Sequence, residues 1–288
     1  MRLINWLAAT LTALAAIVLP VQAETIRFAV TDVEGMEQLQ REYGAFVQEF
    51  EKATGLKVEF TPVNNRTAAV EAVRAEQVDF VLTGPAEYVI FKKLTDAKPV
   101  VGWQRPDYFA QVVVLADGPI KSMMDLKGKK VAFGEIGSTS QQLGPAQVLA
   151  DAGLKYNVDY IAEIIKRNVA VEAMIRGDVQ AVGMNLNHLR SIREKFPDVK
   201  FAVVGRGPDL PNDIMIAASY VPQPIVDSVR KVFLEKGAEL MVGVLKGEDT
   251  KKYDGGHFLA NVSDADYDIV RNMYRTIGVA EFSNFMGE

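Results

Sequence analysis

The chain contains no cysteine and only two histidines among its 288 residues. Without cysteine there is neither a disulfide framework nor a thiol that could carry a lipid behind an N-terminal signal. His188 and His257 lie far apart in the sequence, whereas zinc and copper sites are built from clustered histidine and cysteine ligands. We therefore expect no metal site, and a fold that depends on its hydrophobic core alone.

Positive charge is also scarce, with 32 lysines and arginines against 37 aspartates and glutamates and a formal net charge of −5. Nucleic acids and anionic membrane surfaces attract basic proteins. We therefore expect no nucleic-acid partner. An anionic ligand of such a chain has to be held by local hydrogen-bond donors.

A long apolar run occurs only at the N-terminus. Residues 6–20 are uncharged and mostly apolar, and Val21-Gln22-Ala23 places small residues at the two positions that a signal peptidase reads. We interpret residues 1–23 as a cleaved signal peptide and predict a periplasmic protein that starts at Glu24. An uncleaved anchor is the alternative, although a membrane span needs about 20 apolar residues.

Strand and helix patterns alternate along the rest of the chain, which predicts an α/β fold. The expected strands cover residues 25–30, 57–63, 78–82, 98–103, 109–115, 130–136, 179–184, 199–204 and 213–218. The expected helices cover residues 36–54, 66–75, 86–95, 141–152, 170–176, 187–196, 224–241 and 265–277.

Two breaks in this pattern predict two lobes. A break near Asp107–Phe109 and a turn at Gly205-Arg206-Gly207-Pro208 divide the chain into residues 24–107 with 214–288 as one lobe, and residues 108–213 as an inserted lobe. Ligands of open α/β sheets bind beyond the carboxyl ends of the strands. The loops over residues 83–88 and 134–140 are therefore expected to line a cleft between the lobes.

The run Gly137-Ser138-Thr139-Ser140 stands between an expected strand and an expected helix. The first N–H groups of a helix have no intrahelical partner, and the helix dipole leaves partial positive charge there. Three hydroxyls beside such donors can surround a tetrahedral oxyanion without supplying formal charge. The same run also fits an ordinary N-cap with two loop residues.

Enzyme signatures are missing. The chain has no Gly-x-Ser-x-Gly nucleophile motif and no Gly-x4-Gly-Lys phosphate loop. We therefore expect a binding protein with no catalytic residues and no cofactor, and an unrelated soluble enzyme is the alternative.

Four motifs in order resemble one family of binding proteins. They are residues 83–89 (TGPAEYV), 125–133 (DLKGKKVAF), 137–140 (GSTS) and 211–213 (PND). The chain resembles the phosphate/phosphite/phosphonate substrate-binding proteins of ABC transporters. The resemblance implies a type II periplasmic binding protein, in which each of two lobes is a mainly parallel sheet flanked by helices. It also implies a monomer that closes on a small phosphorus oxyanion and delivers it to a permease in the inner membrane.

Position by position, the resemblance implies a set of ligand contacts. Ser138, Thr139 and Ser140 would hold the phosphoryl oxygens, and Tyr88 would donate its phenol from the opposite lobe. Asp213 would accept a proton from a ligand that keeps one acidic O–H. Each residue also has a structural interpretation, because Tyr88 lies in an apolar helix and Asp213 follows Pro211 at a turn.

The chain departs from the family pattern at two places. Members often carry a histidine and an aspartate in segments that here read 166–169 (KRNV) and 179–181 (VQA), and an Asp-Tyr pair is replaced by Asn65-Arg66. The contacts of any organic part of the ligand therefore stay open, with Asn185 and Trp103 as further candidates for the cleft. The alternative function is a sensory binding protein that presents an oxyanion, including an arsenic oxyanion, to a histidine-kinase receptor.

Overall fold

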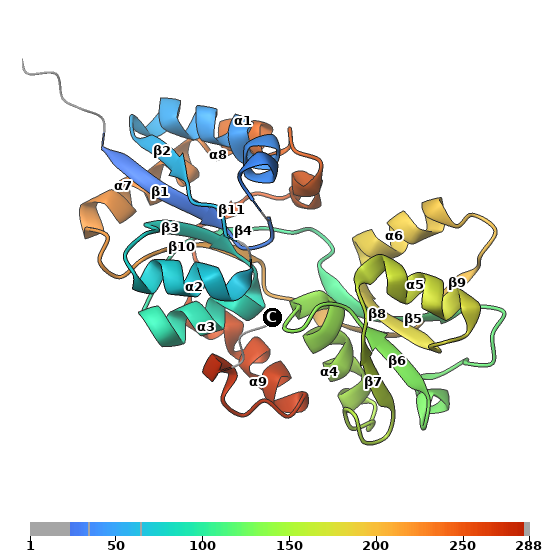
Figure 1. The fold of residues 1–288 in the computed structure, drawn as a ribbon. Helices are drawn as coiled ribbons and strands as arrows, with labels where there is room; N and C mark the ends of the chain where they lie inside the picture. Colours follow the sequence, from blue (N-terminus) through green and yellow to red (C-terminus); the bar gives the residue numbers. More distant parts are fainter. Residues whose placement is uncertain (1–23, 34, 64, 285–288) are drawn as a thin grey trace, which may run out of the picture.

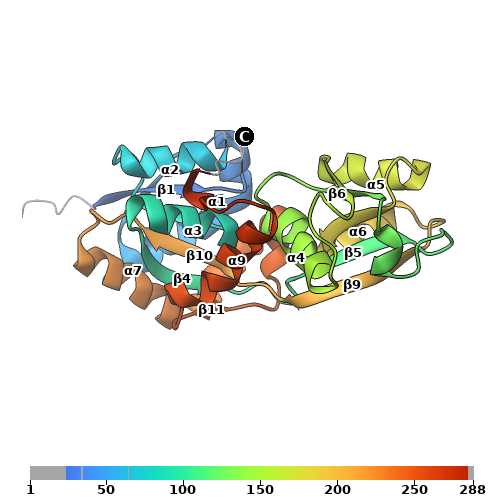
Figure 2. The same ribbon diagram turned by 90° about the horizontal axis from the view of Figure 1, so that it is seen from below.

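The computed structural model describes residues 24–33, 35–63 and 65–284, so the predicted signal peptide over residues 1–23 lies outside the described residues. The described chain forms two sheets, each flanked by helices (Figure 1, Figure 2). We call the six-stranded sheet with its helices the first lobe, and the five-stranded sheet with its helices the inserted lobe. None of the described helices combines the length and the apolarity that a membrane span requires.

The first lobe contains a six-stranded sheet in the order β11-β4-β10-β3-β1-β2. Its strands are β1 (Thr25–Val30), β2 (Lys57–Phe60), β3 (Phe80–Thr83), β4 (Lys98–Trp103), β10 (Asp213–Ala217) and β11 (Phe258–Leu259). Its helices are α1 (Met36–Thr54), α2 (Arg66–Arg74), α3 (Pro85–Thr95), α7 (Gln223–Glu235), α8 (Gly237–Val244) and α9 (Asp268–Thr276). Short 3-10 helices cover Asp249–Tyr253, Asp264–Tyr267 and Phe282–Asn284.

The inserted lobe contains a five-stranded sheet in the order β7-β6-β8-β5-β9. Its strands are β5 (Phe109–Leu115), β6 (Lys130–Phe133), β7 (Ile161–Ile164), β8 (Ala181–Asn185) and β9 (Phe201–Asp209). Its helices are α4 (Gly144–Asp151), α5 (Arg167–Arg176) and α6 (Leu186–Lys195), with a π-helix at Thr139–Leu143 and a 3-10 helix at Met123–Leu126.

Both sheets are mixed, whereas the resemblance implied mainly parallel ones. In the first lobe β1 runs parallel to β2 and β3, but β10 runs antiparallel to both β3 and β4. In the inserted lobe β6 runs parallel to β7 and β8, but β5 runs antiparallel to β8 and β9. The parallel pairs are those connected through helices, as strand–helix–strand units require. The antiparallel strands β5 and β10 are those by which the chain enters one lobe and returns to the other.

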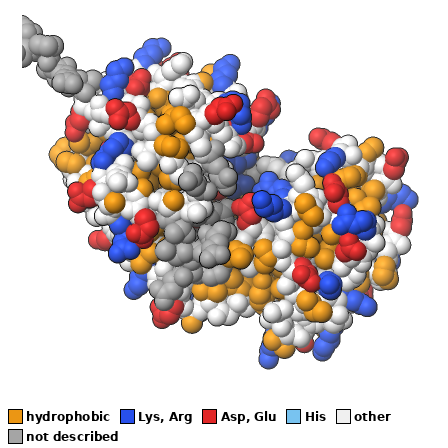
Figure 3. All heavy atoms as spheres, viewed as in Figure 1, with side chains coloured by type: hydrophobic (Ala, Val, Ile, Leu, Met, Phe, Trp, Pro, Cys, Tyr) orange, Lys and Arg blue, Asp and Glu red, His pale blue; other side chains and the backbone are white. Residues whose placement is uncertain are grey.

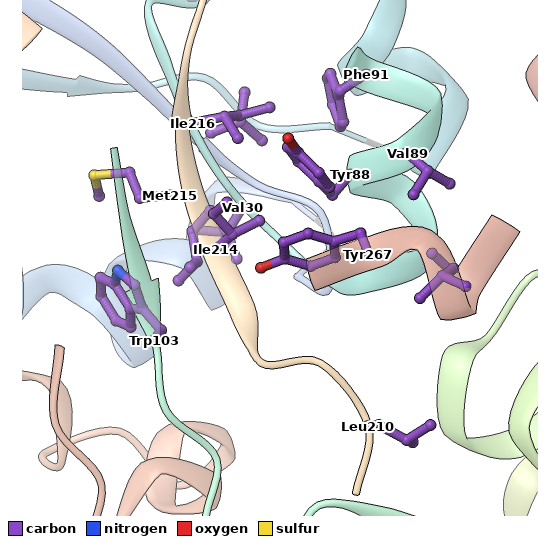
Figure 4. Close-up of a cluster of buried hydrophobic side chains, with 14 of the residues drawn as sticks. Val30, Tyr88, Val89, Phe91, Trp103, Leu210, Ile214, Met215, Ile216 and Tyr267 are labelled. Carbon is purple, nitrogen blue, oxygen red and sulfur yellow. The ribbon is translucent and has the colours of Figure 1, made fainter. Parts of the chain in front are cut away.

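The core of the first lobe is aromatic. Phe46 and Phe50 come from the buried face of α1 and meet Phe233 of α7, with centroids 6.1 and 5.7 Å apart. Trp103, at the end of β4, packs edge-on against Phe258 at 5.0 Å and is fully buried. This sequence candidate for the cleft therefore belongs to the core. Figure 4 shows the neighbouring part of the core, where residues of β10 pack near Tyr88 and Tyr267.

Several elements of the structure differ from those expected, and three of the differences are described here. The expected turn at residues 205–208 is part of β9, an edge strand that pairs with β5 through two register shifts, and edge strands and bulges tolerate glycine and proline. Strand β7 was not predicted, because its four residues carry no clear alternation. The single helix expected over residues 224–241 is two helices, α7 and α8, which meet at Lys236.

The chain crosses from the first sheet to the second between β4 and β5 and returns between β9 and β10. The predicted lobe boundaries lie near these two crossovers, and the second one bears on the site. The predicted boundary between residues 107 and 108 falls between β4 and β5. Asp213, which the predicted division placed at the end of the inserted lobe, is instead the first residue of β10 and pairs with Trp103 in the first sheet. The division of the whole chain into lobes stays a prediction, but Asp213 stands on the side of the first lobe.

Candidate functional site

The serine–threonine run lies at the start of a helix that faces the first lobe. Ser138, Thr139 and Ser140 are buried, with 6, 4 and 4% of their surfaces exposed. The helix begins at Thr139, two residues earlier than the sequence predicted. It starts as a π-helix and continues from Gly144 as α4. π-Helical turns inside α-helices occur frequently at functional sites.

Glycines allow this helix to lie close to the sheet. A Cβ atom on Gly134 would lie 2.1 Å from Oε1 of Gln141, and one on Gly183 of β8 would lie 2.7 Å from the ring of Pro145. Gly137 has a φ of 75°, which glycine adopts readily. These glycines let the backbone at Ser138 to Ser140 approach the edge of the sheet.

A glutamine holds the loop in shape. Oε1 of Gln142 accepts a hydrogen bond from the N–H of Gly137 at 2.7 Å, and its Nε2 donates to the hydroxyl of Tyr156 at 3.1 Å. Gln142 is 4% exposed, so this contact is shielded from water. Sequence reasoning missed Gln142, because a glutamine two residues into an expected helix carries no signal of such a contact.

Thr139 connects the two lobes. Its Oγ1 accepts a hydrogen bond of 3.1 Å from the N–H of Ala86, in the first turn of α3. Helix α3 starts with Pro85, and proline is favoured at a first helical position because it lacks an N–H that would have no partner there. Two helix starts, one from each lobe, therefore face each other, and both carry the N–H donors and the dipole ends that attract anions.

Ser140 is the start of a hydrogen-bonded chain within the inserted lobe. Its Oγ accepts from Nδ2 of Asn185 at 3.1 Å, and Oδ1 of Asn185 accepts from the N–H of His188 at 2.9 Å. A hydrogen bond also joins Ser140 to the hydroxyl of Tyr108. Asn185, the further candidate from the sequence, therefore contacts the serine–threonine run directly and caps α6.

Asp213 lies in a charged cluster that consists of Asp32, Arg105, Asp213, Lys252 and Tyr253. Its Oδ2 accepts from the hydroxyl of Tyr253 at 2.8 Å and lies 3.4 Å from Nζ of Lys252, and its Oδ1 lies 3.3 Å from Nη1 of Arg105. Lys252 also contacts Asp32, at 3.1 Å. Asp213 is 1% exposed, so these contacts are made almost out of water.

Both cations of the cluster keep their charge. Burial lowers the pKa of Arg105, but the Asp213 carboxylate together with Tyr108, Tyr253 and Asp32 outweighs burial, so the pKa is raised overall. The pKa of Lys252 is also raised, because Asp32 and Asp213 together outweigh the cost of burial. Two formal positive charges therefore lie beside Asp213, whereas the sequence led us to expect only neutral donors around a ligand; which of these groups hold a ligand stays a prediction. Sequence reasoning missed Arg105 and Lys252, because neither belongs to a recognisable motif.

Tyr88 occupies a different place from the other four predicted residues. Its side chain is fully buried in the first lobe, and its ring lies 4.3 Å from that of Tyr267 (Figure 4). Its hydroxyl donates to Oδ1 of Asp264 at 3.0 Å. The described contacts thus connect Tyr88 to the core and to Asp264, and a role as ligand donor stays a prediction.

The surface between the lobes is hollowed, and basic and acidic side chains lie near the hollow (Figure 3). Among the described residues no group of three or more histidine, aspartate or glutamate side chains is arranged to hold a metal ion. Two lobes joined by two crossovers, with helix starts facing each other across the junction, define the class of two-lobed binding proteins.

The family follows from sequence comparison. The model of the family "ABC transporter, phosphonate, periplasmic substrate-binding protein" matches residues 28–266. The chain belongs to this family, as the four sequence motifs indicated.

Two relatives are similar in sequence to parts of this chain. The phosphate-import protein PhnD of Mycolicibacterium smegmatis is 33% identical over 138 residues, which cover 46% of this chain and 43% of that protein. The phosphonates-binding periplasmic protein of Escherichia coli is 23% identical over 232 residues, which cover 75% of this chain and 67% of that protein. The match to the first relative thus spans less than half of its length.

Solved structures confirm the fold. PhnD1 from Prochlorococcus marinus, solved in complex with methylphosphonate, superposes with a TM-score of 0.71 at 17% identity and covers 89% of this chain and 99% of that one. A binding protein component of an ABC phosphonate transporter from Pseudomonas aeruginosa superposes with a TM-score of 0.63 at 18% identity, covering 88% and 86%. The prediction of a two-lobed α/β periplasmic binding protein is therefore confirmed, with mixed sheets.

Proposed function

We propose that this protein captures a small phosphorus oxyanion, a phosphonate, phosphite or phosphate, between its lobes and delivers it to the permease of an ABC importer. The membership of the family supports the transport role. The observation that carries the proposal is the contact between Thr139 and the N–H of Ala86, because it brings two helix starts from different lobes to one point. Helix N-termini are ready-made anion sites.

Binding then proceeds by exchange of water for fixed donors. In the open form the hydroxyls of Ser138, Thr139 and Ser140 and the N–H groups beside them are hydrated. Closure surrounds the ligand oxygens with these donors in a buried site, where each unmade hydrogen bond is costly. The permease releases the ligand by favouring the open form, in which water replaces the lost contacts.

The test is binding by the purified protein. Methylphosphonate, an aminoalkylphosphonate, phosphite, phosphate and arsenate are compared by thermal shift and then by calorimetry, with sulfate as the matched tetrahedral control. A ligand that binds only the folded protein raises its unfolding temperature. We expect at least one phosphorus oxyanion to stabilise the protein and sulfate to have a far smaller effect. If sulfate stabilises it as strongly, or no phosphorus oxyanion does, the proposed ligand class is wrong.

Delivery is tested separately in cells. Deletion of the gene is expected to abolish growth on the preferred ligand as sole phosphorus source, and the intact chain restores it. Variants of Ser138 or Ser140 to alanine that bind weakly should restore growth only at high ligand concentration. Normal growth of the deletion strain at low ligand concentration would contradict a role in import.

A further inference from the structure

We propose that Arg105 is a ligand-binding residue, which donates N–H groups and a positive charge to the oxyanion, and that Asp213 is the residue that positions it. The inference rests on the proposed function, because it assigns a further contact in the same cleft. It replaces the expectation that Asp213 itself takes up a proton from the ligand.

Arg105 is placed by the crossover between the two lobes. It follows β4, and its backbone N–H donates to Oδ1 of Asn212 in the other crossover at 2.8 Å. Its guanidinium lies 3.7 Å from the centre of the Tyr108 ring, and 11% of its side chain is exposed. Such stacking fixes the plane of a guanidinium while leaving its edge free for hydrogen bonds.

The guanidinium has more donors than partners. Nη1 makes a long contact of 3.3 Å with Asp213, and Nε is buried without a hydrogen-bond partner among the described residues. A guanidinium carries five N–H donors, and a buried donor without a partner costs free energy. Folded proteins rarely keep such a group unless something outside the chain satisfies it. We assign a ligand oxygen as this partner, because Arg105 lies at the crossover between the two lobes.

Arg105 is also close to the serine–threonine run. The ring on which its guanidinium stacks belongs to Tyr108, whose hydroxyl is hydrogen-bonded to Ser140. The guanidinium therefore lies on the ring face of the same tyrosine whose hydroxyl contacts Ser140. The two pairs of N–H groups of an arginine match two oxygens of a phosphonate, which hydroxyls alone do not.

Asp213 keeps other partners when Arg105 turns to the ligand. Tyr253 donates to Oδ2 at 2.8 Å, and Lys252 lies 3.4 Å from the same atom. The carboxylate therefore remains compensated while its contact with Arg105, on the other oxygen, is shared with the ligand. Asp213 touches the arginine rather than the oxyanion, so it acts as a positioning residue.

The experiment compares Arg105→Gln and Arg105→Lys with Arg206→Gln in binding methylphosphonate, measured by calorimetry. Arg206 is the matched control, because its guanidinium also stacks at 3.7 Å, over Phe109, but pairs with Asp209 at the half-exposed surface of β9. Arg105→Gln is expected to weaken binding about 10- to 100-fold, since hydrogen bonds to charged groups contribute about 1.5–3 kcal/mol. Arg105→Lys is expected to lose less, and Arg206→Gln to stay within about twofold.

Ligand charge separates a binding role from a structural one. Methylphosphonate gains a second negative charge as the pH rises, so removal of a contacting cation weakens binding more at high than at low pH. A loss of equal size for Arg105→Gln at both pH values, or an affinity within twofold of the wild type, would overturn the proposal. If the glutamine variant fails to fold, Arg105→Lys tests the loss of the N–H pairs with the charge kept, and an affinity for methylphosphonate equal to that of the wild type would then overturn the proposal. If the wild type binds no phosphorus oxyanion, the proposed function fails and this inference with it.

Discussion

Replacement of Thr139 by valine removes the hydroxyl that joins the lobes and keeps the shape of the side chain. The N–H of Ala86 belongs to a fully buried residue and donates to Thr139 at 3.1 Å. In the variant this N–H has no partner when the lobes are closed, which costs about 1–3 kcal/mol. In the open form water accepts a hydrogen bond from this N–H, so the substitution makes only the closure of the lobes less favourable. Ligand affinity is therefore expected to fall about 5- to 100-fold, while the stability of the ligand-free open form changes little.

Calorimetry with the best ligand of the panel measures this loss, and small-angle scattering reports whether the lobes still close at saturating ligand. Thr276→Val is the matched control, because that hydroxyl also joins the lobes, through Oε1 of Gln147 at 2.6 Å, but at a half-exposed place where water can replace it. Its affinity is expected to change less than about fivefold. Equal losses in both variants, or unchanged affinity for Thr139→Val with normal closure, would refute the reasoning.

Three further predictions concern the surroundings of the site. Tyr88→Phe is expected to lower the free energy of unfolding by about 1 kcal/mol through loss of the bond to Asp264, with ligand affinity unchanged; a marked loss of affinity in calorimetry would instead favour a ligand role. Burial, helped by a nearby arginine charge, lowers the pKa of His188 to about 3, so His188 stays neutral in the folded protein. The unfolded histidine takes up a proton near pH 6.5, whereas the folded one stays neutral down to about pH 3. The free energy of unfolding therefore falls as the pH drops from 6.5 toward 3, by up to about 1.4 kcal/mol per pH unit. His188→Asn should lack this part of the pH dependence, which urea titrations at several pH values measure. Gly183→Ala forces a methyl group against Pro145 and should cost about 1–3 kcal/mol in thermal unfolding and weaken ligand binding, whereas normal values for both would show that α4 can shift freely.

Most of the elements could be predicted because their sequence patterns are local. The apolar spacing of α1 ends at Gly55, whose φ of 74° and N–H bond to Glu51 terminate the helix where the sequence predicts. Strands β1, β4 and β5 have the predicted bounds. The turn expected at residues 205–208 failed because composition alone does not distinguish a turn from an irregular edge strand. Pairing with β5 decides that question, and pairing is not local.

The same difference between local and long-range contacts separates the site residues that the sequence predicted from those that it missed. The serine–threonine run was predictable, because hydroxyls at a helix start after a strand are a local signal, and the structure places Asn185 beside it. The contact from Thr139 to Ala86 joins residues on different lobes, so only the folded chain brings them together. Arg105 and Lys252 reach Asp213 from separate segments of the chain, and neither position differs in sequence from an ordinary surface cation.

The proposed role of Arg105 would reconcile an acidic chain with an anionic ligand. Arg105 and Lys252 face Asp32 and Asp213, so this group of two cations and two carboxylates carries no net charge before binding. A free cation in the cleft would bind the oxyanion more tightly, but it would also oppose release. On our proposal Arg105 exchanges part of its contact with Asp213 for contact with the ligand, so only the difference between two charged interactions contributes to affinity. On this proposal the cleft would recognise charge while the ligand stayed exchangeable, as delivery to a permease would require.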